Sequence, residues 1–193
     1  AGALPPLVRF LSDEHRGRVQ AAALVLENIA TTNAVRRAVW KEGGIVPLVA
    51  LLKRGSEDEK TAAAGALAAL AGEEDYWPEE GKPDPVLPVM ADAFVDAGVV
   101  KPLVDLLTRG TPDGRGRAVA ATRALAEKLD FHAALIAGGG LTPLIMMLRP
   151  DAYDHAKSRA TAAQTLRIIA ITSEENCEAI EAAVPRGQRG REE

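Results

Sequence analysis

Apolar residues occur in short blocks with helical spacing, and the blocks recur along the chain. A block of the form x-L-[VI]-x-x-L begins at a proline, and a longer block rich in alanine follows after a polar turn. Apolar residues three and four positions apart lie on one face of a helix. Glycine tolerates the backbone conformation that ends a helix, and proline suits the first turn of the next one. The pattern therefore predicts a short helix, a turn and a longer helix in each copy.

The glycine–proline motif occurs four times, with 41, 55 and 41 residues between successive prolines. The alanine-rich block keeps step with it, and its leucine follows the proline by 20, 20, 23 and 23 residues. We therefore expect the copies to differ in the length of a loop. The proline motifs cover residues 2–8, 43–49, 98–104 and 139–145, and the alanine-rich blocks cover residues 22–30, 63–71, 121–127 and 162–170.

A third short helix is expected before each glycine break, so that each unit has three helices. No such unit can bury its apolar face alone, and stacking supplies the continuous core. We predict an all-α, right-handed α-solenoid of about four units, the first and last incomplete, as a single domain over residues 1–184. The third helices are expected at 33–42, 89–97, 131–137 and 176–183, the units near 1–32, 33–75, 89–130, 131–175 and 176–184, and a flexible tail at 185–193.

The motifs G-x-[LIV]-x-P-L-[VI] and A-A-x-x-L-x-N-[IL]-A, with a period near 41 residues, resemble armadillo repeats over residues 1–184. HEAT repeats are the alternative, but they have two helices per unit and lack this glycine–proline break. The resemblance implies a concave groove, lined by the long helices, that binds extended peptides.

In well-known armadillo proteins an Asn on the long helix clamps the ligand backbone, and import receptors add a Trp one turn earlier. The matching positions keep one Asn and no Trp, so import-signal recognition is not expected. The resemblance implies a binding groove at Leu24, Asn28, Arg123, Glu127 and Gln164. Arg123 and Glu127 are four residues apart and could instead pair with each other. The Asn positions are Asn28, Ala69, Glu127 and Ile168, and the Trp positions are Leu24, Gly65, Arg123 and Gln164.

The 55-residue interval contains 14 extra residues, assigned to residues 73–88. This segment has six acidic residues, one lysine and four prolines, which exclude a regular helix. Tyr76 and Trp77 within it are a candidate partner-binding loop, because Tyr and Trp are enriched at interaction hot spots. Trp77 could equally fold back and cover the solenoid surface.

Composition narrows the function classes. The 193 residues include 4% aromatic residues and carry a net charge of −4, which gives no general electrostatic case for binding nucleic acid. The single Cys177 excludes an internal disulfide and suits a reducing compartment. No apolar run is long enough to cross a membrane. We expect a cytoplasmic or otherwise intracellular protein, with an organelle still open because a removed transit peptide leaves no trace.

Catalysis and metal binding have little support. His15, His132 and His155 are far apart and do not share a repeat position with a nucleophile, and one Cys with three distant His residues gives no metal-ligand spacing. We expect no enzymatic activity, no cofactor and no metal.

The expected function is a non-catalytic protein–protein interaction scaffold that presents its groove to partner segments. Two alternatives stay open. The chain could be a structural subunit of a large multiprotein assembly, bound through its ends, convex face and acidic loop. It could also be the substrate-recruiting region of a larger ubiquitin ligase. In each case the partner is another protein.

Overall fold

The computed structural model describes residues 2–72, 92–127, 129–149, 152 and 155–185. Tyr76, Trp77 and the tail from residue 186 lie outside these residues. The regular elements of the described part are α-helices. They are α1 (Leu4–Phe10), α2 (Arg16–Ile29), α3 (Asn33–Lys41), α4 (Ile45–Arg54), α5 (Glu57–Ala71), a helical stretch at 92–96, α7 (Val100–Arg109), α8 (Pro112–Ala126), α9 (Leu129–Ala137), α10 (Leu141–Met147), α11 (Ala156–Ala170) and α12 (Glu174–Ala183).

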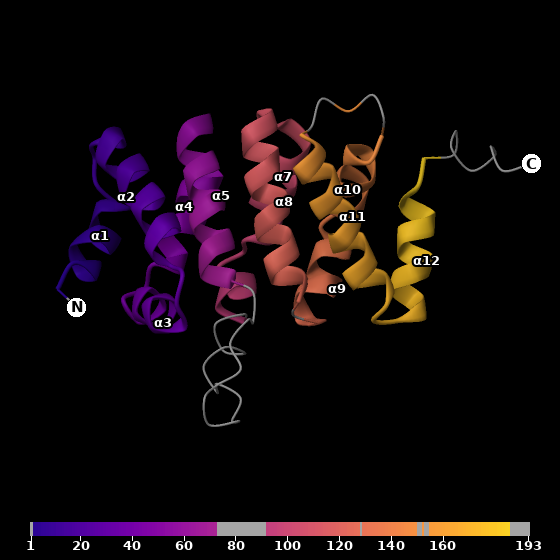
Figure 1. The fold of residues 1–193 in the computed structure, drawn as a ribbon, viewed down its shortest axis with the longest axis horizontal. Coiled ribbons are helices and arrows are strands. Elements are labelled where there is room, and N and C mark those ends of the chain that lie inside the picture. The colour runs from indigo at the N-terminus through magenta and orange to yellow at the C-terminus, as the bar shows by residue number, and fades with distance from the viewer. Residues whose placement is uncertain (1, 73–91, 128, 150–151, 153–154, 186–193) are drawn as a thin grey trace, which may run out of the picture.

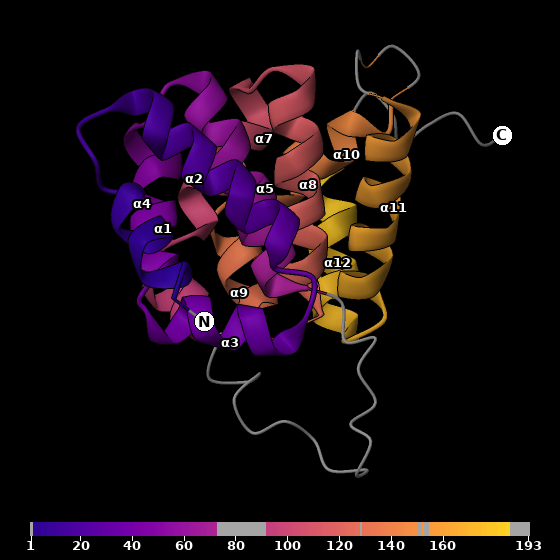
Figure 2. The same cartoon turned by 60° about the vertical axis from the view of Figure 1, so that its left-hand side comes forward.

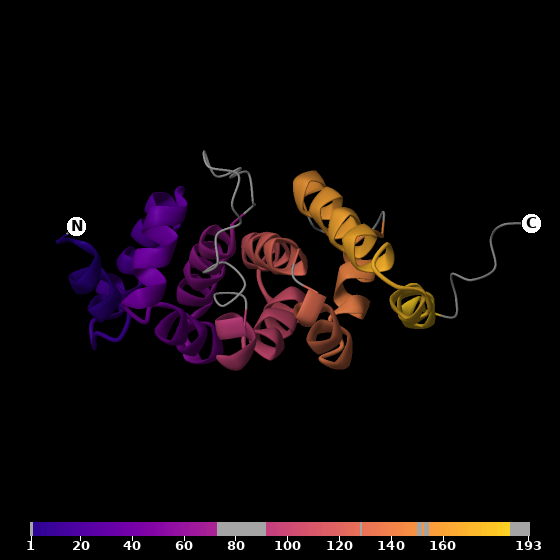
Figure 3. The ribbon, with the colours of Figure 1, turned by 90° about the horizontal axis from the view of Figure 1, so that it is seen from below.

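The helices follow one another in chain order along the long axis of the molecule (Figure 1). The long helices α2, α5, α8 and α11 pack side by side, and α4, α7 and α10 pack against them as a second row. Turning the molecule shows the same two rows (Figure 2). Seen from below, the helices form a shallow arc, in which the violet and orange segments reach higher in the picture than the magenta and salmon segments between them (Figure 3). The long helices therefore line a concave face.

The glycine–proline breaks have the predicted geometry. Gly43, Gly98 and Gly139 have φ of 76°, 71° and 75°, a left-handed conformation that a residue with a Cβ atom adopts only at a cost. The N–H of the residue after each glycine donates to a carbonyl in the last turn of the preceding helix, as Gly44 N does to Val39 O at 2.9 Å. Pro47, Pro102 and Pro143 then occupy the first turn of α4, α7 and α10. This confirms the predicted three-helix organisation.

Small side chains let the long helices approach closely. Ala63, Ala64 and Ala66 of α5 and Ala118 and Ala121 of α8 are fully buried. Leucines at the ends of these contacts, such as Leu26 and Leu67, fill the remaining space. One continuous core runs from Leu11 to Ile169, as expected for stacked units that share their apolar faces.

The register predicted for the third long helix is wrong by three residues. The N-caps of α2, α5, α8 and α11 are His15, Ser56, Thr111 and His155. Eleven residues after the N-cap stand Leu26, Leu67, Thr122 and Leu166, and all four side chains are buried. Leu125, chosen from the sequence as the equivalent leucine, lies one turn further on. Thr122 can replace a leucine in the core because its hydroxyl donates to Ala118 O at 2.8 Å.

Polar side chains at one repeated position join the C-terminal ends of the long helices. Arg36, the fourth residue of α3, donates from Nε to Ala30 O and to Ala69 O, both at 3.0 Å. These carbonyls are at the ends of α2 and α5. Burial lowers the pKa of the Arg36 guanidinium, which nevertheless stays charged near neutral pH. A cation at two helix C-termini is favourable because it meets unpaired carbonyls and the negative end of the helix dipole.

His132, the fourth residue of α9, has the equivalent role in a later unit. Its Nε2 lies 2.6 Å from Ala126 O at the end of α8, and its Nδ1 lies 3.2 Å from the hydroxyl of Thr172, which follows α11. Because a carbonyl only accepts, Nε2 carries a hydrogen. His132 is buried and hydrogen-bonded, and it acts as a joint between units.

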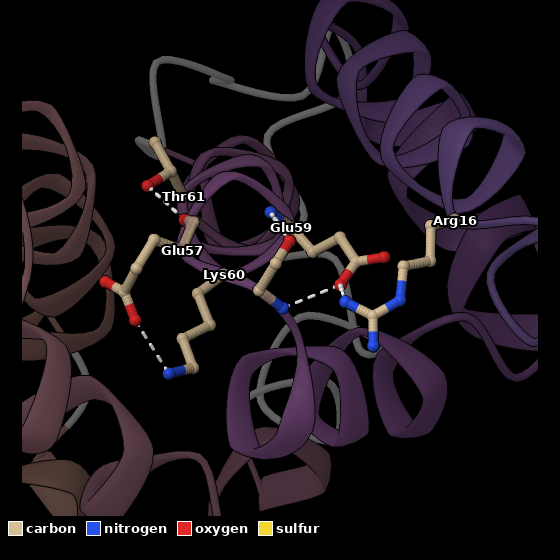
Figure 4. Close-up of polar contacts among 6 residues, drawn as sticks. Arg16, Glu57, Glu59, Lys60 and Thr61 are labelled. Atoms are coloured by element: carbon tan, nitrogen blue, oxygen red, sulfur yellow. Dashed lines mark hydrogen bonds and ion pairs between the residues drawn. The ribbon is translucent and has the colours of Figure 1, made fainter.

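The N-terminal end of α5 is fixed by its own side chains. Ser56 and Glu59 form a capping box, in which the Ser56 N–H donates to Glu59 Oε2 at 2.6 Å (Figure 4). Arg16, at the start of α2, approaches the same carboxylate at 4.0 Å, and Lys60 pairs with Glu57 at 2.9 Å. Glu59 is buried, and the Ser56 N–H and Arg16 compensate its charge.

Candidate functional site

The concave face consists of residues that are exposed or half-buried at steps of three and four along the long helices. On α8 they include Gly116, Ala120 and Arg123, and on α11 they include Gln164 and Arg167. The buried residues of the same helices pack against the second row. Among the described residues, the concave face is therefore the side of the long-helix row that the second row of helices does not cover.

Counting from the N-cap of each long helix shows which predicted residues occupy equivalent positions. Nine residues after the N-caps stand Leu24, Gly65, Ala120 and Gln164, and thirteen residues after them stand Asn28, Ala69, Ala124 and Ile168. Leu24, Asn28 and Gln164 keep the positions predicted for them. Arg123 and Glu127 do not, because Ala120 and Ala124 occupy those positions on α8. The sequence was misleading here because the alanines of α8 fit the motif in two registers.

The predicted groove residues differ in what they contact. Asn28 is exposed, and its Nδ2 donates to Leu24 O at 2.7 Å, which uses one of its two amide hydrogens within α2. Arg123 and Glu127 form an ion pair within one helix, with Nη1 and Oε1 3.9 Å apart. This is the pairing that their four-residue spacing allowed. Gln164 is exposed on α11.

An ion pair that the sequence did not suggest covers the centre of the concave face. Arg117 Nη1 of α8 donates to Glu27 Oε1 of α2, across the intervening helix α5. Gly65 of α5 lies beneath it, and a Cβ atom there would come closer than 3.0 Å to both side chains. A helix-interior glycine costs about 1 kcal/mol relative to alanine. A glycine among the alanines and leucines of α5 was therefore the sequence feature that could have indicated a close contact with this helix.

His15 and His155 are the N-cap residues of α2 and α11. His155 Nε2 is 3.5 Å from Asp113 Oδ1, and both side chains are exposed. Asp13 Oδ1 accepts from the His15 N–H at 2.8 Å, and this hydrogen bond, assisted by Arg18, lowers the pKa of the Asp13 carboxyl. Among the residues that the structure describes, no three His, Cys, Asp or Glu side chains are grouped so that they could hold a metal ion.

Two pockets lie between neighbouring helices of the second row, and each also borders the N-terminal part of a long helix, Glu57 and Lys60 of α5 in the first and Arg115 of α8 in the second. The first, of about 470 Å³, lies between α4 and α7 and is lined by charged residues that include the Lys101–Asp105 ion pair. The second, of about 510 Å³, lies between α7 and α10, where Met146, Met147 and Pro143 replace most of these charges. They are equivalent gaps between successive units.

Within the described ranges, no helix combines the length and the apolar character that a membrane crossing requires.

The sequence matches no protein-family model and no curated protein sequence. Solved structures do resemble it. The crystal structure of an engineered protein aligns with a TM-score of 0.79 and 28% identity, covering 95% of this chain and 68% of that one. A computationally designed armadillo repeat protein for modular peptide recognition aligns with a TM-score of 0.78 and 28% identity, covering 94% and 71%. The chain has an armadillo-like repeat fold.

A second designed armadillo repeat structure contains a bound peptide. It is a designed armadillo repeat protein in complex with the peptide (KR)4, with a TM-score of 0.80 and 24% identity, covering 95% of this chain and 71% of that one. The right-handed α-solenoid predicted from the sequence is thereby confirmed as a fold, together with its three-helix armadillo units. These comparisons concern the fold and assign no role to the residues on the concave face of this chain.

Proposed function

We propose that this chain is a non-catalytic protein-interaction scaffold whose concave face, formed by α2, α5, α8 and α11, binds an extended segment of a partner protein. The observation that carries the proposal is the concave face of an armadillo-like solenoid, which no described helix of the second row covers. Designed proteins with this fold include one bound to a peptide and one made for peptide recognition. A preformed face of packed helices loses little conformational freedom on binding, which favours affinity for a flexible segment.

The candidate contacts are Leu24, Asn28 and Gln164, at positions that recur along the long helices. An Asn or Gln amide offers one acceptor and two donors, which suits the backbone of an extended chain. Arg123 and Glu127 stay in the proposal as charged residues of the same face, one turn from the positions first assigned to them. Ala120 leaves room on α8 for a partner side chain.

The test is selection of binding peptides from a displayed random library against the immobilised chain, followed by groove variants. Ala120→Trp fills the half-buried concave position on α8 and should lower the affinity for the selected peptides at least about tenfold. Ala50→Trp is the matched control, because Ala50 is exposed on α4 in the second row. Asn28→Ala and Gln164→Ala should each weaken binding several-fold.

Deletion of residues 73–85 tests the acidic segment with Tyr76 and Trp77 as the alternative surface. Loss of binding with this deletion, and none with Ala120→Trp, would assign binding to that segment. Equal loss with Ala120→Trp and Ala50→Trp would indicate general damage to the fold. Peptides that bind all three variants unchanged would refute both surfaces.

A further inference from the structure

The Glu27–Arg117 pair occupies the centre of the face to which the preceding section assigns binding. The long helices lie in the order α2, α5, α8, so a pair between the first and the third must cross the second. Gly65 provides the space, because it has no side chain where these two side chains meet. A segment lying along the concave face over α5 would meet this pair before it reached Gly65.

The pair is incomplete as a hydrogen-bonded unit. Arg117 donates to Glu27 Oε1, whereas Glu27 Oε2 is buried and has no hydrogen-bond partner. A guanidinium can satisfy both oxygens of a carboxylate through two parallel bonds, and an oxygen buried without a donor is destabilising. The Arg117 and Glu27 side chains keep 35% and 27% of their exposure, so solvent and a ligand can reach the pair. These features are those of a contact that a better-matched ligand can replace.

Opening the pair would leave two half-buried charges on different helices, a carboxylate on α2 and a guanidinium on α8. Removing one partner of such a pair is costly because the other charge remains without compensation. A ligand with a single charge would compensate only one of the two. We propose that Glu27 and Arg117 form a displaceable cover, and that the partner segment replaces it with one basic residue on Glu27 and one acidic residue on Arg117. This inference rests on the groove function proposed above.

The geometry sets the spacing of the two charges in the partner. Packed helix axes are about 8–10 Å apart, so α2 and α8, on a curved row, are separated by at most about 16–20 Å. An extended chain advances about 3.3–3.6 Å per residue, which places the basic and acidic residues at most about six positions apart.

Exposed basic residues on α11 favour the same polarity. Lys157 and Arg167 are exposed on α11, beyond Arg117. The basic end of the partner is therefore expected over α2 and its acidic end over α8 and α11.

The experiment is an NMR titration of the full chain, labelled with ¹⁵N, with capped synthetic peptides that have an arginine and a glutamate six positions apart and a Ser/Ala spacer. The comparison peptides replace arginine by citrulline, glutamate by glutamine, or both, and one peptide exchanges the two charged ends. The backbone amide of Gly65 is the reporter. In one of the two orders, the doubly charged peptide should shift this amide and bind up to about fivefold more tightly than either singly charged peptide.

The chain with Glu27→Gln and Arg117→Gln should lose this preference and bind all the peptides alike. The control chain with Lys101→Gln and Asp105→Asn, an exposed pair on α7, should retain it. Equal binding of charged and neutral peptides, or a preference that survives Glu27→Gln with Arg117→Gln, would overturn the inference. In that case, library-selected peptides that still respond to Ala120→Trp would leave the groove function standing. If neither peptide set responds to the groove variants, both proposals are refuted.

Discussion

Replacing Gly65 by alanine tests whether the Glu27–Arg117 pair lies over this glycine. In an unobstructed helix interior, glycine to alanine stabilises by about 0.8–1.0 kcal/mol. In this chain the new Cβ would come closer than 3.0 Å to Arg117 Nη1 and to Glu27 Oε2 and Cδ, so the two side chains must separate. An ion pair of this exposure contributes up to about 1 kcal/mol. The two effects offset each other, and Gly65→Ala should leave stability within about 0.5 kcal/mol of the original chain.

The same substitution should have its full effect once the pair is removed. In a chain with Glu27→Ala and Arg117→Ala, Gly65→Ala is expected to raise the free energy of unfolding by about 0.8–1.0 kcal/mol. Urea unfolding followed by circular dichroism measures both differences. Gly17→Ala is the control, because a Cβ at Gly17 meets no atom within 4 Å, and its effect should be equal in the two chains. An equal effect of Gly65→Ala in both chains would refute the reasoning.

Three further predictions concern Arg36, the cap of α5 and Asp13. Arg36→Met should lower the free energy of unfolding by about 2 kcal/mol, because two carbonyls at helix C-termini lose a charged donor, whereas Arg36→Lys should keep part of this stability. Urea unfolding measures both differences, and a lysine variant as stable as the original chain would contradict the prediction. Ser56→Ala should cost about 1 kcal/mol by loss of the α5 cap, whereas Ser12→Ala, at an exposed turn residue, should cost little. The Asp13 carboxyl should titrate below its ordinary pKa in an NMR titration. Because that pKa is depressed in the folded state, its contribution to stability is present above the unfolded pKa and is lost as pH falls through the folded value; an Asp13 pKa at or above the ordinary value would contradict this.

The helices and their breaks could be predicted from the sequence because the residues that specify them act locally. Glycine after a helix and proline in the next first turn each limit the backbone of one or two residues, and both occur where predicted. The starts of α9 and α12, at Leu129 and Glu174, are each two residues earlier than predicted. The start of α12 depends on the preceding Ser173, whose side chain caps the helix by accepting from Asn176 N.

The concave face was harder to predict because it depends on register and on contacts between distant residues. In α8 a threonine takes a core position that leucine holds in the other units, so matching leucine to leucine moved the register by almost one turn. Glu27 and Arg117 are 90 residues apart, and nothing in either segment indicates that the other is near. The role of His132 likewise becomes clear only when α9 is compared with α3, in which the residue at the same position is Arg36.

The joints at Arg36 and His132 have a mechanical consequence. Both bind the C-terminal ends of neighbouring long helices. At the N-terminal ends the contacts are longer and include exposed side chains: Arg16 and Glu59 are 4.0 Å apart, and His155 and Asp113 are 3.5 Å apart. Where these joints occur, bending of the solenoid should therefore keep the C-terminal ends of the long helices together and move their N-terminal ends apart. The concave face would then widen from one edge only, which admits a bulky partner from that side.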